Sequence, residues 1–456
     1  MSRVWLLLVF LAACGPKLAD VEDGEWLPGG ETTNTLLLGS NAFMRPSANL
    51  SDEHESEFYS GNSFFNLGWV TAPASTEARD GLGPLYNATS CSGCHFKDGR
   101  AAPPDGPDSF PVGSLVRISL AAADGTLGPD PIYGGQIQDI GIQGVPAEAT
   151  VQITWLEDTD GAYADGTSYT LRRPELVLAN PAYGDLPPDL LRSFRVGPAT
   201  IGLGLLEAIS EADLDAVADP GDADGDGISG RLAQVDDLRL GTLAPGRFGW
   251  KAEQPTVEQQ SAGAFAGDVG ITSALFGNDD CTPDEAECNE AISGGDPELD
   301  EDTLAAVALY SRTLAPPVRE DWESETVLRG KYLFADVGCA SCHTATWTTG
   351  VAAISELEGQ QIWPYTDMLL HDMGDDLSDD RPTGDADGVE WRTPPLWGLG
   401  RYPDVSGHQY LLHDGRARGV TEAILWHGGE AEASREAFVA LDAEDREALA
   451  WFVNAL

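Results

Sequence analysis

Basic residues are scarce in this chain. Lysine and arginine together number 26 against 75 aspartates and glutamates, which gives a formal charge of −49. Lysine itself stands only at positions 17, 97, 251 and 331. A surface this acidic repels the phosphates of DNA and RNA, so we exclude nucleic acid as a partner. The acidity suits solubility or a saline habitat, and it leaves a positively charged protein partner open.

Long apolar runs are absent after the first residues. No later stretch approaches the roughly 18 apolar residues that a membrane-spanning helix needs. The start, with Arg3, an apolar run at residues 4–10 and then Leu-Ala-Ala-Cys14, predicts a signal peptide over residues 1–13. Residues 11–14, Leu-Ala-Ala-Cys, resemble a bacterial lipobox. This predicts a lipid on Cys14 that tethers the exported protein to a membrane.

The predicted location is therefore the periplasm. Gly15 follows the lipidated cysteine where an aspartate would signal retention at the inner membrane, so we expect anchoring at the outer membrane. A plain signal peptide with an incidental cysteine is the alternative.

Cysteine is also used sparingly, and most of it lies in two short segments. Both segments read Cys-X-X-Cys-His, and their residues are Cys91, Cys94 and His95 in the first and Cys339, Cys342 and His343 in the second. Two thiols at this spacing can add to the vinyl groups of a haem while the next imidazole reaches the iron. We therefore predict two covalently attached haems c, with His95 and His343 as iron ligands.

A zinc site and a disulfide redox pair are the other uses of such cysteine pairs. Structural zinc sites usually draw four ligands from closely spaced pairs, whereas these pairs lie far apart in the sequence. A redox pair has no need of the following histidine. Cys281 and Cys288 remain as a close pair, which in an oxidising compartment predicts a disulfide that closes a small loop.

Two helical segments of the sequence repeat one another. Residues 299–314 align with 441–456 at a constant offset, and each has an aspartate at the N-cap, acids in the first turn and an apolar stripe at helical spacing. Gly61 and Gly330 begin matching Gly-X-X-apolar-Phe segments ahead of the haem motifs. The repeat predicts a mainly α fold of two cytochrome c-like helical haem domains. Their predicted limits are an irregular arm at 14–60, a first domain at 61–317 and a second domain at 318–456.

The first domain is much longer than the second, and its additional residues carry two features. Alternating segments at 150–155 and 168–172 flank Asp-Gly turns and predict a β-hairpin within a large insertion with long loops. Asp222, Asp224 and Asp226, with Gly227 following, resemble the start of an EF-hand calcium loop. Position twelve of that loop is Ala233 rather than glutamate, so a calcium site and a solvated acidic turn both remain open.

Several further segments resemble a known family. They are 81–84 ahead of the first haem motif, 202–209, 246–251, 270–273 and 413–430. Together with the haem motifs they are similar to the bacterial di-haem cytochrome c peroxidase superfamily, which includes the enzyme that matures methylamine dehydrogenase. The chain is more similar still to a branch of di-haem oxidoreductases or peroxidases, formerly called thiol oxidoreductases, and the matching segments cover most of the chain from about Gly29 onward.

The resemblance implies a second ligand for the C-terminal haem. In the peroxidases a Phe-His-X-Gly segment precedes the distal methionine at a fixed spacing, and from His413 that spacing reaches His427. Imidazole in place of a thioether lowers the expected potential. The other candidates downstream of the second motif are Met373, which ranks next, and His371, His408 and His413.

The N-terminal haem has no evident second ligand. His54, the only other histidine ahead of the second motif, lies in a Gly-, Asn- and Ser-rich context that suggests a mobile arm. An open iron position is what peroxide binding requires, and a buried carboxylate nearby would assist O–O cleavage. The resemblance points to Glu207 as this catalytic group, with a structural glutamate as the alternative. Trp250 is expected to carry electrons between the haems or to be an ordinary core residue.

These features predict an exported di-haem c-type oxidoreductase that reduces hydrogen peroxide with electrons from a small donor protein or a small-molecule reductant. An electron-transfer lipoprotein without turnover is the alternative, and oxidation of a thiol or protein substrate by high-valent haem is a third reading. The resemblance also implies that a homodimer can form.

Overall fold

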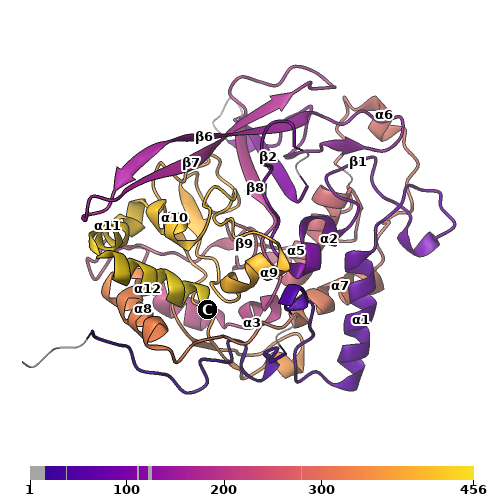
Figure 1. Cartoon of the computed structure of the whole chain (residues 1–456). Helices are drawn as coiled ribbons and strands as arrows, with labels where there is room; N and C mark the ends of the chain where they lie inside the picture. Colours follow the sequence, from indigo (N-terminus) through magenta and orange to yellow (C-terminus); the bar gives the residue numbers. More distant parts are fainter. Residues whose placement is uncertain (1–15, 37–38, 110–111, 122–125, 279) are drawn as a thin grey trace, which may run out of the picture.

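The structure, a computed structural model, describes residues 16–36, 39–109, 112–121, 126–278 and 280–456 (Figure 1). Helices account for 29% of the chain and strands, in many small sheets, for 19%. The prediction of a mainly α, cytochrome c-like fold is therefore wrong. Most strands between the helices are too short to leave a period in the sequence, whereas capped helices leave a strong one.

Four helices form two equivalent pairs. They are α1 (Asp52–Asn66) packed on α7 (Glu301–Thr313), and α8 (Glu325–Asp336) packed on α12 (Ala443–Asn454). Asp300 caps α7 by accepting a hydrogen bond from the Thr303 amide, and Asp442 caps α12 by accepting one from the Asp445 amide. The predicted helical repeat is confirmed.

Each pair crosses at a glycine. A Cβ atom on Gly61 would lie 2.1 Å from the Ala306 carbonyl oxygen, and one on Gly330 would lie 2.1 Å from that of Ala448. The missing side chain therefore lets the two backbones approach closely. Phe65 and Phe334, four residues later, place their rings 6.3 and 5.9 Å from those of His95 and His343. A phenylalanine from each helix pair thus lies beside a motif histidine.

The insertion forms the largest sheets. β2 (Ser114–Ala121) lies between β8 (Leu191–Val196) and the short β3 (Leu127–Gly128) and β4 (Gln136–Ile137), all antiparallel. β2 pairs Val116 with Phe194, and both side chains are buried in a hydrophobic cluster separate from the main core.

A long hairpin made by β6 (Thr150–Ala162) and β7 (Ser168–Ala179) confirms the prediction at 150–172 and extends it. It reaches across the C-terminal part of the chain towards α11 (Figure 1). The Arg172 guanidinium lies over the rings of Trp155 and Tyr410 and donates hydrogen bonds to the Gly415 and Arg416 carbonyls. Insertion and C-terminal residues are thereby joined.

The remaining elements are short. The helices are α2 (Cys91–Cys94), α3 (Leu203–Glu207), α4 (Glu211–Val217), α5 (Val257–Ala264), α6 (Ala286–Asn289), α9 (Tyr402–Val405), α10 (Val420–Leu425) and α11 (Glu432–Ala440). The strands form the antiparallel pairs β1 (Leu85–Tyr86) with β5 (Ile140–Gly141), β9 (Gln234–Asp237) with β10 (Thr242–Pro245), β11 (Trp347–Thr348) with β12 (Gln361–Ile362), and β13 (Leu370–Asp372) with β14 (Glu390–Arg392).

The first described residues wrap the body. The Ala19 amide donates to the Leu328 carbonyl, and the Asn34 amide donates to that of Pro316. His54 lies on α1 rather than on an irregular arm, with its Nδ1 2.8 Å from Glu356 Oε1. The main hydrophobic core includes residues on both sides of Pro317, such as Leu205 and Trp397, and the domain division there stays a prediction. Among the described helices, none has the length and apolar character needed to cross a bilayer.

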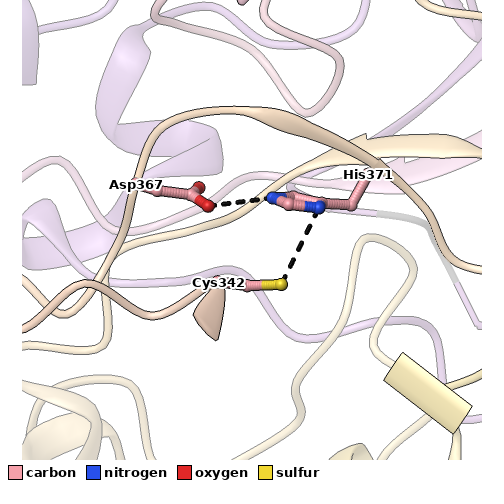
Figure 2. A group of neighbouring side chains, drawn as sticks. All are labelled: Cys342, Asp367 and His371. Carbon is pink, nitrogen blue, oxygen red and sulfur yellow. Dashed lines mark hydrogen bonds and ion pairs between the residues drawn. The ribbon is translucent and has the colours of Figure 1, made fainter. Parts of the chain in front are cut away.

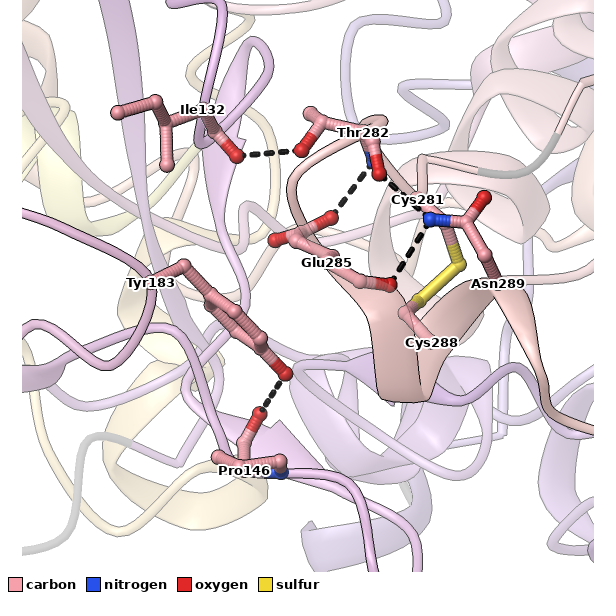
Figure 3. The surroundings of a disulfide bond; sticks show 8 residues. All are labelled: Ile132, Pro146, Tyr183, Cys281, Thr282, Glu285, Cys288 and Asn289. Carbon is pink, nitrogen blue, oxygen red and sulfur yellow. Dashed lines mark hydrogen bonds between the residues drawn. A yellow bond between two sulfur atoms is a disulfide. The ribbon is translucent and has the colours of Figure 1, made fainter.

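The predicted disulfide joins Cys281 and Cys288 (Figure 3). Beside it Glu285 accepts a hydrogen bond from the Thr282 amide, and the Thr282 hydroxyl donates to the Ile132 carbonyl. Glu285 is also hydrogen-bonded to Glu148, and both carboxyl groups are buried. Burial, reinforced by this partner, raises the pKa of Glu148, so the pair keeps a proton between its two carboxyl groups.

This pair predicts a pH-dependent stability. A carboxyl group whose folded pKa is raised contributes stability at low pH and loses it as the pH rises above its ordinary value of 4.5. Glu148→Gln keeps a hydrogen-bonding group without the charge. The melting temperature of the variant relative to the parent should therefore increase from pH 5 to pH 8. A constant difference across that range would contradict the prediction.

Candidate haem site

The two motif histidines are held alike. His95 follows α2, and its Nδ1 lies 2.7 Å from the Pro198 carbonyl oxygen; His343 follows the 3₁₀ turn Cys339–Ser341, and its Nδ1 lies 3.0 Å from that of Tyr365. A carbonyl oxygen can only accept, so Nδ1 carries the proton and Nε2 keeps its lone pair. Burial lowers the pKa of both rings, that of His343 to about 4, which favours the neutral form that binds iron.

The four motif cysteines are free thiols. Burial raises the pKa of Cys91 and Cys339 to about 12 and also raises that of Cys94 and Cys342. Among the described residues only one of these four cysteines, Cys342, belongs to a group that could hold a metal ion, so the two pairs do not form a four-cysteine zinc site. Their surroundings are compatible with thiols that become thioethers.

Both motifs open into one cavity of about 390 Å³. Its wall includes Cys94 and His95 from the first motif and Cys339, Cys342 and His343 from the second. Trp250, whose indole N–H donates to the Val196 carbonyl, also lines it. Two planar cofactors attached at these motifs would therefore share one compartment, and Trp250 belongs to its wall.

Cys342, Asp367 and His371 come close enough to hold a metal ion (Figure 2). Both ring nitrogens of His371, however, already lie at hydrogen-bond distance from carboxylates. Nε2 of His371 lies 2.9 Å from Asp367, and Nδ1 lies 2.7 Å from Glu430. Burial opposes charge on this ring, but hydrogen bonds with Asp367, Cys342 and Glu430 outweigh it and raise the pKa to about 12. A ring protonated on both nitrogens cannot bind iron.

His427 has the geometry of a ligand. Its Nδ1 lies 2.6 Å from the Ala423 carbonyl oxygen one turn earlier, which leaves Nε2 available, and the side chain lines the same cavity as His343. Met373 and His413 line it too, but the His413 ring is stacked on Trp391 at 3.8 Å. His427 as the second ligand stays a prediction, with Met373 next.

Glu207 does not reach the cavity. It ends α3, and its carboxylate accepts hydrogen bonds from Arg312 Nε at 2.6 Å and from the Val257 amide at 2.7 Å. The preceding residue, Leu206, lines the cavity instead, because one residue along a helix turns the side chain by a large angle. The structure thus assigns Glu207 the structural role that was its alternative reading.

Two other carboxylates line the cavity among the described residues, Glu253 and Asp268. Burial raises the pKa of Asp268, while Arg117 and a 2.9 Å hydrogen bond from Gln136 oppose the rise. Burial would also raise the pKa of Glu253, but its ion pair with Arg195 keeps that pKa below its usual range. The sequence could have pointed to both carboxylates through their positions. Glu253 follows the family-like segment 246–251, and Asp268 precedes the segment 270–273.

The acidic loop brings Asp222, Asp224 and Asp226 within 4.8 Å of one another. Ala233, at the twelfth position, is buried in the core and contributes no oxygen. Calcium binding stays a prediction. A site filled to 100 times its dissociation constant stabilises the fold by about 2.7 kcal/mol, so calcium should raise the melting temperature and EDTA should reverse it. Asp224→Asn should lose the increment, and no response to calcium in the parent would contradict the prediction.

The comparisons with known proteins agree with the haem motifs. The chain matches the family described as "Di-haem oxidoreductase, putative peroxidase" over residues 25–113 and 129–456. No curated protein matches it. A solved structure of hydrazine synthase from Kuenenia stuttgartiensis aligns over 97% of this chain and 100% of its own at 12% identity, with a TM-score of 0.28. The resemblance seen in the sequence is confirmed: the chain belongs to the di-haem oxidoreductase family, and its cofactors are haems.

Proposed function

We propose that this protein is an exported di-haem c-type oxidoreductase that reduces hydrogen peroxide to water. Each turnover consumes one peroxide, two electrons and two protons and releases two waters. The observation that carries the proposal is the single cavity lined by both Cys-X-X-Cys-His motifs and by buried carboxylates. Two redox cofactors in one compartment can supply the two electrons that the O–O bond requires.

The residues fit covalently attached haems. Cys91 and Cys94 in the first motif, and Cys339 and Cys342 in the second, form no disulfide and have the spacing of the haem vinyl groups. His95 and His343 each present Nε2, and the carbonyls of Pro198 and Tyr365 fix their rings. When bound, the haems supply iron for peroxide binding and for electron storage.

His427 distinguishes the two haem positions in this proposal. It gives the C-terminal haem a second imidazole and leaves that haem to store and pass electrons. No comparable ligand is assigned to the N-terminal haem, since His54 is bound to Glu356 and does not line the cavity within the described chain. The N-terminal position is therefore the proposed site of peroxide reduction.

Asp268 replaces Glu207 as the proposed proton carrier. It lines the cavity with His95, and burial raises its pKa, which eases exchange of a proton at the carboxylate oxygen. Gln136 holds the same carboxylate through a 2.9 Å hydrogen bond and fixes its orientation. Trp250 is the proposed path for electrons along the cavity wall.

The cellular setting is part of the proposal. Residues 1–15, with the predicted signal peptide and the lipid on Cys14, lie outside the described residues. The Cys281–Cys288 disulfide supports an oxidising compartment such as the periplasm. The acidic surface supports a small basic electron carrier as donor and argues against nucleic acid. A homodimer remains part of this expectation.

Rapid mixing tests the reaction. Reduced protein mixed with hydrogen peroxide should be oxidised far faster than free haem, with two electrons consumed per peroxide. The resting protein should show one high-spin haem that binds cyanide and one low-spin haem in absorption and paramagnetic resonance spectra. Two low-spin haems that bind neither cyanide nor peroxide would reject the peroxidase function and favour an electron-transfer protein.

A further inference from the structure

Two arginines in the haem cavity, the buried Arg100 and the half-buried Arg392, form no ion pair with any described carboxylate. Arg100 and Arg392 both line the cavity, and neither forms an ion pair with a carboxylate anywhere in the described ranges. The Arg100 guanidinium donates to the Leu412 carbonyl, and its buried Nε has no partner. Arg392 donates only to the Gly249 and Thr393 carbonyls and to Met368 sulfur.

The nearest ionisable groups do not compensate these charges. Around Arg100 stand Tyr402, His408 and Asp414, and Asp414 already accepts from Arg416 Nε at 2.7 Å. Around Arg392 stand Glu253 and Asp367.

Both of those carboxylates are also engaged. Glu253 is ion-paired with Arg195 at 2.5 Å, and Asp367 lies 2.9 Å from His371 Nε2 (Figure 2). Of the other arginines that line the cavity, Arg195 and Arg435 form ion pairs, and Arg117 lies near Asp268, a carboxylate that no other arginine engages. Among the described residues, the carboxylates nearest to Arg100 and Arg392 are thus all engaged by other groups.

Burying an unpaired cation is costly, and the cost falls when an anion enters with a ligand. Burial lowers the pKa of both arginines to about 10, which reflects the same missing counter-charge. The lack of anions is local, because the chain as a whole carries a charge of −49. Acidic residues therefore cover the surface, while this part of the cavity keeps two free cations.

The two arginines flank one residue. The Arg100 guanidinium lies 5.2 Å above the Trp250 ring, and the Arg392 amide donates to the Trp250 carbonyl at 3.0 Å. Arg100 follows the first haem motif by a few residues, and Arg392 ends β14, whose partner β13 carries His371 beside Cys342 of the second motif. One cation thus belongs to each haem's surroundings.

We propose that Arg100 and Arg392 each bind a haem propionate, one from each haem. A haem brings two carboxylates into a cavity that otherwise offers these guanidiniums only carbonyls. Arginine pairs with a carboxylate through two parallel N–H bonds, and burial strengthens the pair. The inference rests on the haem cofactors of the family and not on peroxide as the substrate.

Arg100→Gln and Arg392→Gln test it in the full-length holoprotein. Ferric haem carries one more positive charge than ferrous haem, so loss of a nearby cation should lower the midpoint potential of one haem. The released propionate should regain an ordinary pKa, so this midpoint should become dependent on pH in the range of about 4 to 6. Its propionate bending band in the resonance Raman spectrum should also shift.

Matched variants complete the experiment. Arg173→Gln, at an exposed ion pair with Asp158, makes the same charge change outside the cavity and should leave both potentials unchanged. Arg100→Lys and Arg392→Lys retain the cation if a glutamine variant fails to take up haem, and they should keep the potentials near those of the parent. A shifted potential without a Raman change, or unchanged potentials with both haems bound, would overturn the proposal.

Discussion

Gly330→Ala is expected to destabilise the protein by about 3 kcal/mol, near the upper end of the usual cost of overpacking. The new Cβ would lie 2.1 Å from the Ala448 carbonyl oxygen and 2.5 Å from the Phe452 Cβ. Alanine gains roughly 0.5–1 kcal/mol over glycine inside a helix, which is smaller than the steric penalty. The steric penalty exceeds the gain in helix propensity because α8 and α12 must separate to relieve the clash.

Equilibrium unfolding in denaturant measures this change. Gly263→Ala is the matched control, because Gly263 also lies inside a helix, α5, but its Cβ would meet neighbours at ordinary distances of 3.5 Å and beyond. That variant should be as stable as the parent or slightly more stable. Equal stability of both variants would show that the helices tolerate a wider crossing.

Asp268→Asn is expected to slow peroxide reduction by roughly 10²–10⁴-fold, the usual contribution of a positioned acid–base group. The amide keeps the size of the side chain and its contact with Gln136 but cannot carry the proton. Haem content and the spectra of the resting protein should stay unchanged. Stopped-flow oxidation of the reduced protein by peroxide gives the rate.

Glu207→Gln is the control that separates the two carboxylates. It removes the charge that pairs with Arg312 at 2.6 Å, outside the cavity, so it should lower stability and leave the peroxide rate nearly unchanged. A large loss of rate in Glu207→Gln with a normal rate in Asp268→Asn would reverse the assignment.

Features that depend on residues close together in the sequence could be predicted. The capped helices α7 and α12 and the Cys281–Cys288 disulfide follow from short-range spacing, and each is found as expected. The haem motifs follow from the same kind of spacing, and the family match agrees with haem cofactors. The β6–β7 hairpin was visible because its strands alternate between turn residues.

The fold class was not predictable, because it depends on what lies between these signals. β13 and β14 are three residues each, too short for a period to show, yet they carry His371 and Arg392 to the cavity. The position of Glu207 outside the cavity was unpredictable for a related reason. A family-like segment indicates that a site is near, but the direction of one side chain depends on partners such as Arg312, which are distant in the sequence.

The β6–β7 hairpin has a consequence for the order of assembly. Arg172 meets the carbonyls of Gly415 and Arg416 across sequence separations of 243 and 244 residues. Contacts between such distant residues form slowly, because a long loop must close first. The hairpin can therefore dock only after Gly415 and Arg416 have been synthesised and folded. The insertion thus precedes the second haem motif in the sequence but completes its packing after it.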